Sequence, residues 1–408
     1  MISGKILQNF AHLVLSVGVN LQKDQGLEIA CPVEKCEVAR AFCEEAYKMG
    51  AKIVQVRWSD EEIDKLNYKN ADESALKDIP KWFVDSKNYL IEKGFCYVAI
   101  SADDPQAFKD VSPDKLSAVF KARSKALKKF SDCVMANGIR WCVVSVPTLA
   151  WAKQVFPNSE NPIEELSNAI VKTMRLNSLN PTKDWLEHIE RLNSRANFLN
   201  SARFEYLHFK NSIGTNLKVG LADNHLWTSA RERAKDGIDF VANMPTEEVF
   251  TAPHRLKVNG TLKSAMPLCE NGQIIDDFSI TFERGKIVDF SARIGYETLK
   301  NLIETDEGTY RLGEVALIGK NSPISQSGIL FYNTLFDENA SCHLAIGKGY
   351  PTTVLDGEKL SKQELKELGL NDSTEHVDFM IGTHDLSVTG IKKDGSKFLI
   401  FKDGEWTI

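Results

Sequence analysis

The 408-residue sequence has no hydrophobic run long enough to span a membrane and no long block of like charge. A transmembrane helix needs about 18 or more consecutive apolar residues, so we expect no membrane partner. Lysine and arginine number 50 against 56 aspartate and glutamate residues, which gives a formal net charge of -6. Because this balance offers no general attraction to phosphate backbones, we also expect no nucleic-acid partner.

Common catalytic and metal-binding motifs are missing too. The eight cysteines lie mostly inside apolar segments, and none has the CxxC spacing of a zinc ribbon or a redox site. We therefore expect reduced thiols and a cytoplasmic protein. The Gly-rich nucleotide-binding turn, the P-loop, HExxH and GxSxG are also absent from the places where they would act. Any chemistry must come from residues that are scattered along the chain.

The first half of the sequence alternates short apolar runs with longer helical patterns. This alternation is typical of βαβ units and a mostly parallel sheet, whereas the second half is rich in Gly-punctuated strands. With 43% hydrophobic residues and about 150 residues per domain, the chain is long enough for two or three domains. We predict a small doubly wound α/β N-terminal domain, residues 1–190, followed by an α+β metal-binding C-terminal domain, residues 191–408.

The expected elements follow from these patterns. In the first half we expect strands at 27–31, 51–58, 95–101 and 140–146, with a long helix at 113–137 and further helices at 162–176 and 183–198. In the second half we expect strands at 203–209, 215–221, 286–294 and 313–319.

Glu314 is the first unusual residue of the second half. It is the only charge in the run GEVALIG (313–319), which otherwise has the composition of a buried strand. An unpaired carboxylate there would cost several kcal/mol or stay protonated. Either a pairing cation such as Arg311 or a metal ion would compensate it.

His376 and Asp378 lie in the segment EHVDFMIG (375–382). Period-two alternation places both side chains, with Met380, on one face of a strand. The two side chains can therefore chelate a metal ion together, or they form a local hydrogen-bonded pair.

Glu338 and His343 lie in FDENASCHLAIGKGY (336–350), where we expect a short helix from about Ala340 to Gly347 or Gly349. Asp337 or Asn339 would cap this helix. Glu338 would then stand at the start of the helix and His343 on its second turn, so that both converge on one point. The alternatives are a carboxylate that interacts with the helix dipole and a hydrogen-bonded core histidine, with Tyr350 serving in packing.

Glu247 and Glu248 lie between two prolines in MPTEEVFTAP (244–253). On an extended segment their side chains point to opposite sides, so at most one of them faces any given site. The alternative interpretation is a solvated turn.

The four segments NMPTEEVFTAP, GEVALIG, SGILFYNTLFDENASCHLAIGKGYP and EHVDFMIG resemble, in this order and spacing, the signature segments of the thermophilic-type metallo-aminopeptidase family. RWCVVSVPTLAWAKQVFP (140–157) resembles the family's first-domain signature, so the similarity covers nearly the whole chain. The resemblance implies a two-metal site in the second domain, with the family's active-site tyrosine at Tyr350, and usually a homodimer. The implied ligands are Glu248, Glu314, Glu338, His343, His376 and Asp378.

Four carboxylates and two imidazoles suit two divalent ions, namely Co²⁺, Zn²⁺, Mg²⁺ or Mn²⁺. We expect Glu314 to bridge the two ions, which would acidify a shared water. The Tyr350 hydroxyl would donate to the developing oxyanion, and Glu247 or a loosely held ligand would accept the proton. The predicted function is removal of the N-terminal residue from short peptides with a free N-terminus. The alternatives are another metal-dependent amidase or phosphoesterase, or a non-catalytic binding protein.

Overall fold

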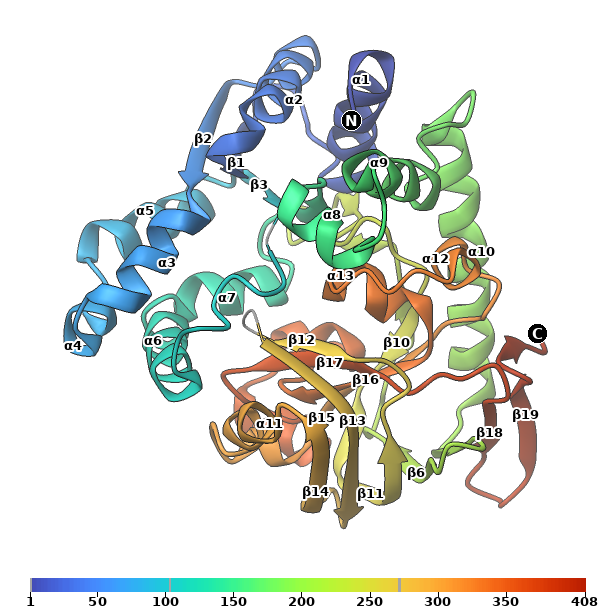
Figure 1. Ribbon diagram of the computed structural model, residues 1–408. Helices are drawn as coiled ribbons and strands as arrows, with labels where there is room; N and C mark the ends of the chain where they lie inside the picture. Colours follow the sequence, from blue (N-terminus) through green and yellow to red (C-terminus); the bar gives the residue numbers. More distant parts are fainter. Residues whose placement is uncertain (1, 103, 271–272) are drawn as a thin grey trace. The chain divides into compact units, whose positions relative to one another are not determined.

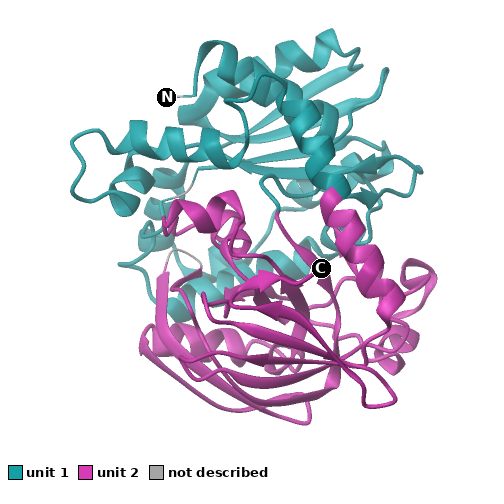
Figure 2. Cartoon of the chain, turned by 90° about the vertical axis from the view of Figure 1, so that its right-hand side faces the viewer, with its two compact units in different colours: residues 1–190, 230–246 teal, residues 191–229, 247–408 magenta. Residues whose placement is uncertain are grey.

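The computed structural model describes residues 2–102, 104–270 and 273–408. The chain forms two compact units (Figure 2): unit 1 is Met1–Glu190 with Ala230–Thr246, and unit 2 is Arg191–Ser229 with Glu247–Ile408. The return of residues 230–246 to unit 1 has no counterpart in the sequence patterns, and the two-domain division at residue 190 stays a prediction. Within the described residues, no helix combines the length and apolar character that a bilayer crossing requires.

Unit 1 contains a four-stranded parallel sheet in the order β2-β1-β3-β4 (Figure 1). The strands are β1 (Gly26–Pro32), β2 (Ile53–Ser59), β3 (Cys96–Ser101) and β4 (Trp141–Ser145). The order reverses direction next to β1, as in doubly wound folds. All four predicted strands of the first half are therefore present, and the expectation of a parallel sheet is confirmed.

The helices of unit 1 connect these strands. They are α1 (Gly4–Leu13), α2 (Cys36–Lys48), α3 (Glu61–Asn70), α4 (Glu73–Lys77), α5 (Lys81–Glu92), α6 (Pro113–Ala126), α7 (Lys128–Met135), α8 (Leu149–Val155), α9 (Pro162–Thr173) and α10 (Pro181–Ala202), which continues into unit 2. Local sequence explains where several of them begin: Asp60 caps α3, and a proline occupies the first turn of α6 and of α9. The single helix predicted over 113–137 is divided at Leu127.

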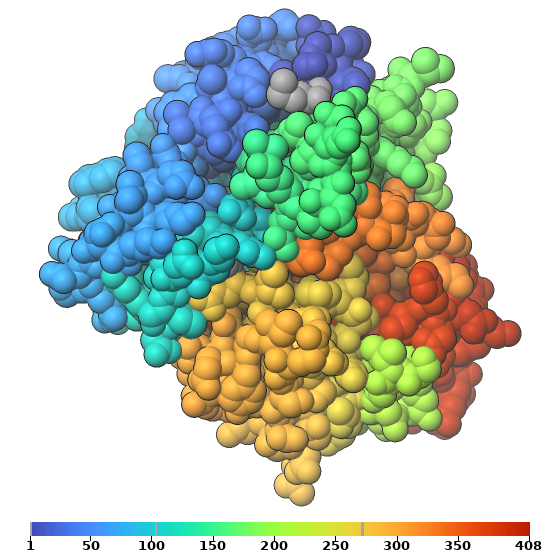
Figure 3. Space-filling model, viewed as in Figure 1, coloured from blue at the N-terminus to red at the C-terminus, as the bar shows by residue number. Residues whose placement is uncertain are grey.

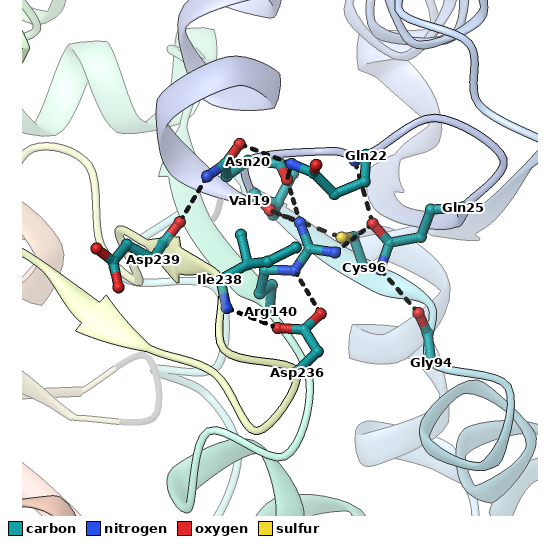
Figure 4. A network of polar contacts seen from close by, with 10 residues as sticks. All are labelled: Val19, Asn20, Gln22, Gln25, Gly94, Cys96, Arg140, Asp236, Ile238 and Asp239. Atoms are coloured by element: carbon teal, nitrogen blue, oxygen red, sulfur yellow. Dashed lines mark hydrogen bonds and ion pairs between the residues drawn. The ribbon is translucent and has the colours of Figure 1, made fainter.

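Arg140 ties the 230–246 segment to the rest of unit 1 (Figure 4). Its guanidinium is 2% exposed and donates to the carbonyl oxygens of Val19 and Asn20, to Gln25 Oε1 and to Asp236. The same segment also carries the short strands β8 (Glu232–Arg233) and β9 (Asp239–Phe240).

Unit 2 is built on antiparallel sheets. A five-stranded sheet has the order β17-β16-β15-β10-β7, with β7 (Thr228–Ser229), β10 (Val249–Thr251), β15 (Leu312–Leu317), β16 (His343–Gly347) and β17 (His376–Met380). A nine-stranded sheet contains β5 (Tyr206–Lys210), β6 (Asn216–Leu221), β11 (Pro253–Lys263), β12 (Leu268–Glu270), β13 (Gln273–Glu283), β14 (Lys286–Ile294), β18 (Ser387–Ile391), β19 (Lys397–Lys402) and β20 (Glu405–Trp406). The turn between β13 and β14 projects at the lower edge of Figure 3.

The helices of unit 2 include α11 (Tyr296–Ile303), α12 (Pro323–Ser327), α13 (Thr334–Asp337) and α14 (Lys362–Glu367), and the 3₁₀ turn η4 (Glu338–Ala340) follows α13 directly. A parallel sheet in unit 1 and antiparallel sheets in unit 2 confirm the mixed α/β character predicted from the sequence.

The helix predicted from Ala340 to Gly347 is wrong. Residues His343–Gly347 form the strand β16, every residue of which is buried. A short, wholly apolar run in the centre of a sheet has the same composition as a buried helix, and periodicity does not separate the two. The predicted caps also differ: Asn333 caps α13, while Asp337 accepts hydrogen bonds from the amides of Phe331 and Asn333.

We predict that Arg140→Met lowers the free energy of unfolding by about 2–4 kcal/mol, because buried carbonyl oxygens lose a charged donor. Urea denaturation measures this loss. The control is Arg233→Met in the same segment, since the Arg233 side chain is 71% exposed in its ion pair with Asp239. Equal urea midpoints for the two variants would show that the buried hydrogen bonds of Arg140 do not stabilise the fold more than the exposed ion pair of Arg233 does.

Candidate metal centre

One face of the five-stranded sheet collects the predicted ligands. Directly opposed residues of antiparallel strands point to the same face. Glu314 on β15 lies opposite Ala345 on β16, which in turn lies opposite Asp378 on β17. His343 lies opposite Ala316, two residues beyond Glu314 and on the same face. Glu314, His343 and Asp378 therefore project from one surface, although they are far apart in sequence.

Two further side chains reach this face from its edges. His376 lies two residues before Asp378 on β17, as the sequence predicted. Glu248 comes directly before β10, and Phe250 of that strand lies opposite Ala316. The expectation that Glu314, His376 and Asp378 lie on strands is confirmed.

A β-bulge sets the direction of Glu314. The register between β15 and β16 shifts between Leu312 and Glu314, so one extra residue, Gly313, is inserted. A Cβ atom on Gly313 would lie 2.3 Å from the carbonyl oxygen of Lys348. Glycine is required here because the backbone of Lys348 approaches too closely for any side chain.

Glu314 lies between the two histidines. Its Oε1 is 3.5 Å from His343 Nε2, and its Oε2 is 3.6 Å from His376 Nε2. Glu248 Oε2 lies 3.3 Å from His343 Nε2, and Asp378 Oδ1 lies 3.4 Å from His376 Nε2. Two groups with metal-binding donor atoms result, Glu248–Glu314–His343 and Glu314–His376–Asp378, and Glu314 belongs to both.

Backbone carbonyl groups orient both imidazoles. His343 Nδ1 is 2.8 Å from the carbonyl oxygen of Glu338, and His376 Nδ1 is 2.6 Å from that of Lys348. A carbonyl oxygen only accepts, so Nδ1 carries the proton in each ring. In the neutral rings the lone pair of Nε2 then faces carboxylate oxygens, an arrangement that needs a proton or a metal ion between the atoms. Metal-binding histidines have this same outer hydrogen bond.

Burial makes the acidic members of the centre costly to ionise. Glu314 is 4% exposed and Glu338 is 7% exposed. Burial raises the pKa of Glu314 to about 7. Burial, together with the nearby Asp378 and Glu248 carboxylates, raises the pKa of Glu338 well above its usual value. Among the described residues, no lysine or arginine forms an ion pair with either carboxylate.

Among the described residues, the ion pairs of these acids are with His343 and His376. Burial alone would lower the pKa of His376, but the adjacent Asp378 carboxylate reverses this effect and raises the pKa to about 9. Among the described residues, buried Asp378 Oδ1 has no well-formed hydrogen bond, and its near polar neighbours are His376 Nε2 at 3.4 Å and His343 Nε2 at 3.8 Å. An acid-rich site whose carboxylate oxygens face two oriented Nε2 atoms fits divalent metal ions.

The remaining predicted residues lie around this centre. Glu338 is in neither three-residue group, yet its carboxylate interacts electrostatically with those of Glu248, Glu314 and Asp378. The Tyr350 ring is partly exposed, and its centroid is 4.9 Å from that of His376. Glu247 interacts electrostatically with Arg195.

Arg311 does not compensate Glu314. Its Nη1 donates instead to the carbonyl oxygen of Arg255. No ion pair joins Arg311 to Glu314, both of which lie in the described part of the chain. The alternative in which Arg311 pairs with Glu314 is therefore wrong, and Glu314 faces His343 and His376 instead.

Sequence reasoning missed the groups that support the ligands. Lys348 acts through its backbone carbonyl, which leaves no trace in the side-chain pattern. Asn339 contacts the Glu338 carboxylate, and its position directly after Glu338 was the one available signal.

The fold and the buried acid–histidine face define a candidate divalent-metal centre. Comparison with known proteins agrees: residues 4–406 match the family model described as thermophilic metalloprotease (M29). The chain is 42% identical to Aminopeptidase 2 of Geobacillus stearothermophilus and 36% identical to Aminopeptidase T of Thermus thermophilus, with 98% of each chain covered in both cases. Wild-type AmpT from Thermus thermophilus superposes with a TM-score of 0.91 at 35% identity, with 99% of both chains covered.

The chain therefore belongs to the thermophilic metalloprotease family, and the resemblance predicted from its sequence segments is confirmed. Membership in a metalloprotease family implies a divalent-metal cofactor and a hydrolase that acts on peptide bonds. The 2,5-dihydroxypyridine dioxygenase of Pseudomonas putida shares the fold alone, with a TM-score of 0.56 at 12% identity.

We predict that the metal-free protein releases protons when Zn²⁺ is added at pH 7. Metal binding requires ionised carboxylates and neutral imidazoles, whereas a Glu314 pKa of about 7 and a His376 pKa of about 9 leave protons on both groups. Titration calorimetry in buffers of different ionisation enthalpy measures the number of protons released. Glu314→Gln should release fewer, and metal binding without proton release would contradict the assignment.

The same pKa shifts predict how metal stabilisation changes with pH. Protonated His376 stabilises the metal-free fold below its ordinary pKa of 6.5, and this stabilisation is lost as pH rises through about 9. Glu314 destabilises the fold as pH rises from 4.5 to about 7. The increase in melting temperature on adding metal should therefore grow between pH 6 and about pH 9.

Proposed function

We propose that this protein is a metallo-aminopeptidase that removes the N-terminal residue from short peptides by means of two divalent ions held on either side of Glu314. The observation that carries the proposal is the position of Glu314, whose two oxygens face two different oriented histidines. Family membership and relatives that are named aminopeptidases support the reaction class.

The proposed ligands divide into two groups around Glu314. Glu248 and His343 would hold one ion, with Glu338 beside them, and His376 and Asp378 would hold the other. Four carboxylates balance the charge of two divalent ions, which explains how so many acids remain buried together. Oxygen and imidazole donors suit Co²⁺, Zn²⁺, Mn²⁺ or Mg²⁺.

When bound, such ions supply a Lewis acid and an acidified water. The side chains of the protein orient the substrate and move protons. Tyr350, whose ring lies next to His376, would donate a hydrogen bond from its hydroxyl group to the oxygen on which negative charge develops. Glu247 or a loosely held ligand accepts the proton of the attacking water.

The family resemblance also implies a homodimer, and the reduced thiols predict a location in the cytoplasm. Both remain predictions, which sedimentation of the purified protein over a dilution series and fractionation of its host cells would test.

The first test of the proposed function compares a leucyl peptide that has a free N-terminus with its N-acetylated twin. We expect cleavage of only the free peptide, loss of that cleavage on chelation, and recovery when Co²⁺ or Zn²⁺ is restored. Equal cleavage of the blocked peptide would instead indicate a general amidase. Turnover of phosphate esters would indicate a phosphoesterase, and a protein that binds no metal and cleaves neither peptide would be a binding protein.

A second test of the proposed function concerns the hydroxyl group of Tyr350. Tyr350→Phe should lower kcat by about 10²-fold or more with little change in KM, as for the loss of one oxyanion donor. Metal content, measured by atomic emission, should remain that of the wild type. Tyr310→Phe is the control, because the Tyr310 ring contacts the Lys286 side chain and Tyr310 belongs to neither group of metal-binding residues. An unchanged kcat for Tyr350→Phe would contradict the donor role.

A further inference from the structure

Asn339 uses both ends of its side-chain amide and its backbone carbonyl oxygen, although it is 0% exposed. Its Oδ1 accepts from the amide of Glu247 at 2.7 Å, and its Nδ2 donates to the carbonyl oxygen of Leu335 and to Glu338 Oε1. Its own carbonyl oxygen accepts from Ser322 Oγ at 3.1 Å. A side chain that is bonded at both ends and anchored through its backbone has one orientation available to it.

The Oδ1 contact fixes the segment that carries Glu248. Glu247 immediately precedes Glu248, which in turn immediately precedes β10. Because the amide of Glu247 is held by Asn339, the chain enters β10 in one position. Glu248 Oε2 then reaches to within 3.3 Å of His343 Nε2.

The Nδ2 contact fixes Glu338. The distance from Asn339 Nδ2 to Glu338 Oε1 is 3.3 Å. The backbone of Glu338 has a second role, since its carbonyl oxygen accepts the Nδ1 proton of His343. The pair Glu338–Asn339 therefore joins three proposed ligands of unit 2, namely Glu338 and His343 of one segment and Glu248 of another.

The chemistry requires an amide at this position. Asparagine offers an acceptor and a donor on one planar group, which matches the Glu247 amide on one side and the Glu338 carboxylate on the other. An aspartate of the same shape keeps the acceptor, but it loses the donor and places a negative charge beside Glu338.

We propose that Asn339 is a positioning residue that holds Glu248, Glu338 and His343 together and thereby sets the affinity of the metal ion on their side of Glu314. This inference rests on the proposed two-metal function. It assigns no contact with substrate to Asn339.

The test is Co²⁺ titration of the full-length metal-free protein, followed by visible absorption, with Asn339→Asp as the variant. Loss of a partner that supports a metal ligand typically weakens metal binding by about 10–100-fold. We expect one of the two binding steps to weaken by that factor while the other changes by no more than about threefold, with a shifted cobalt spectrum for the weakened step.

Asn200→Asp is the matched control. Asn200 also uses both ends of its amide, which bond to the amide and carbonyl groups of Trp227 at 2.8 Å each. It should lose thermal stability in the metal-free form but keep both Co²⁺ affinities. If Asn339→Asp does not fold, Ser322→Ala removes only the hydrogen bond to the Asn339 carbonyl, and it should weaken the same binding step by a smaller factor.

The outcomes are distinguishable. A wild-type protein that binds no Co²⁺ would overturn the proposed function itself. If the wild-type protein binds two ions and Asn339→Asp binds them with unchanged affinities, only the positioning role is overturned. The same holds for Ser322→Ala where that variant replaces Asn339→Asp. If Asn339→Asp and Asn200→Asp weakened both binding steps to the same extent, the cause would be general destabilisation of the fold. That result would also overturn the positioning role of Asn339.

Discussion

Negative charge buried against oriented imidazoles is the constraint on which the rest of unit 2 depends. Removing an ionised carboxylate from water costs several kcal/mol even after relaxation, and Glu248, Glu314, Glu338 and Asp378 are gathered on one protein surface. Protons on the acids and on the histidines meet part of this cost, as the raised pKa of Glu314 shows. The two divalent cations that we propose would meet it more completely, so the same arrangement that weakens the metal-free fold would favour a metal-loaded one.

The antiparallel sheet makes this arrangement possible with little reliance on loops. Cross-strand pairing places Glu314, Ala345 and Asp378 in one row, so the proposed ligands Glu314 and Asp378 are held by a ladder of backbone hydrogen bonds. The bulge at Gly313 has two effects in one place: it turns Glu314 to the ligand face, and it admits the Lys348 carbonyl group that orients His376. Ligands on strands with fixed outer hydrogen bonds are pre-organised, which is how a protein obtains metal affinity from ordinary side chains.

The strand-borne ligands could be predicted from sequence, because period-two alternation and a lone charge in an apolar run are local signals. His376, Asp378 and Glu314 lie on strands as expected. The segment around His343 was predicted as a helix, since HLAIG has no alternation to show that it is a central strand. Convergence of the segments could not be derived from spacing either, because it depends on strand order, and only the family resemblance supplied it. Asn339 and the Lys348 carbonyl group were missed because their roles are defined by contacts across the fold.

The claim that Glu314 stands between two metal ions is tested most directly by anomalous diffraction from crystals of the cobalt-loaded protein. The account predicts two anomalous peaks, one bounded by Glu248 and His343 and the other by His376 and Asp378, with the Glu314 carboxylate between them. A single peak, or two peaks that do not share Glu314, would contradict it.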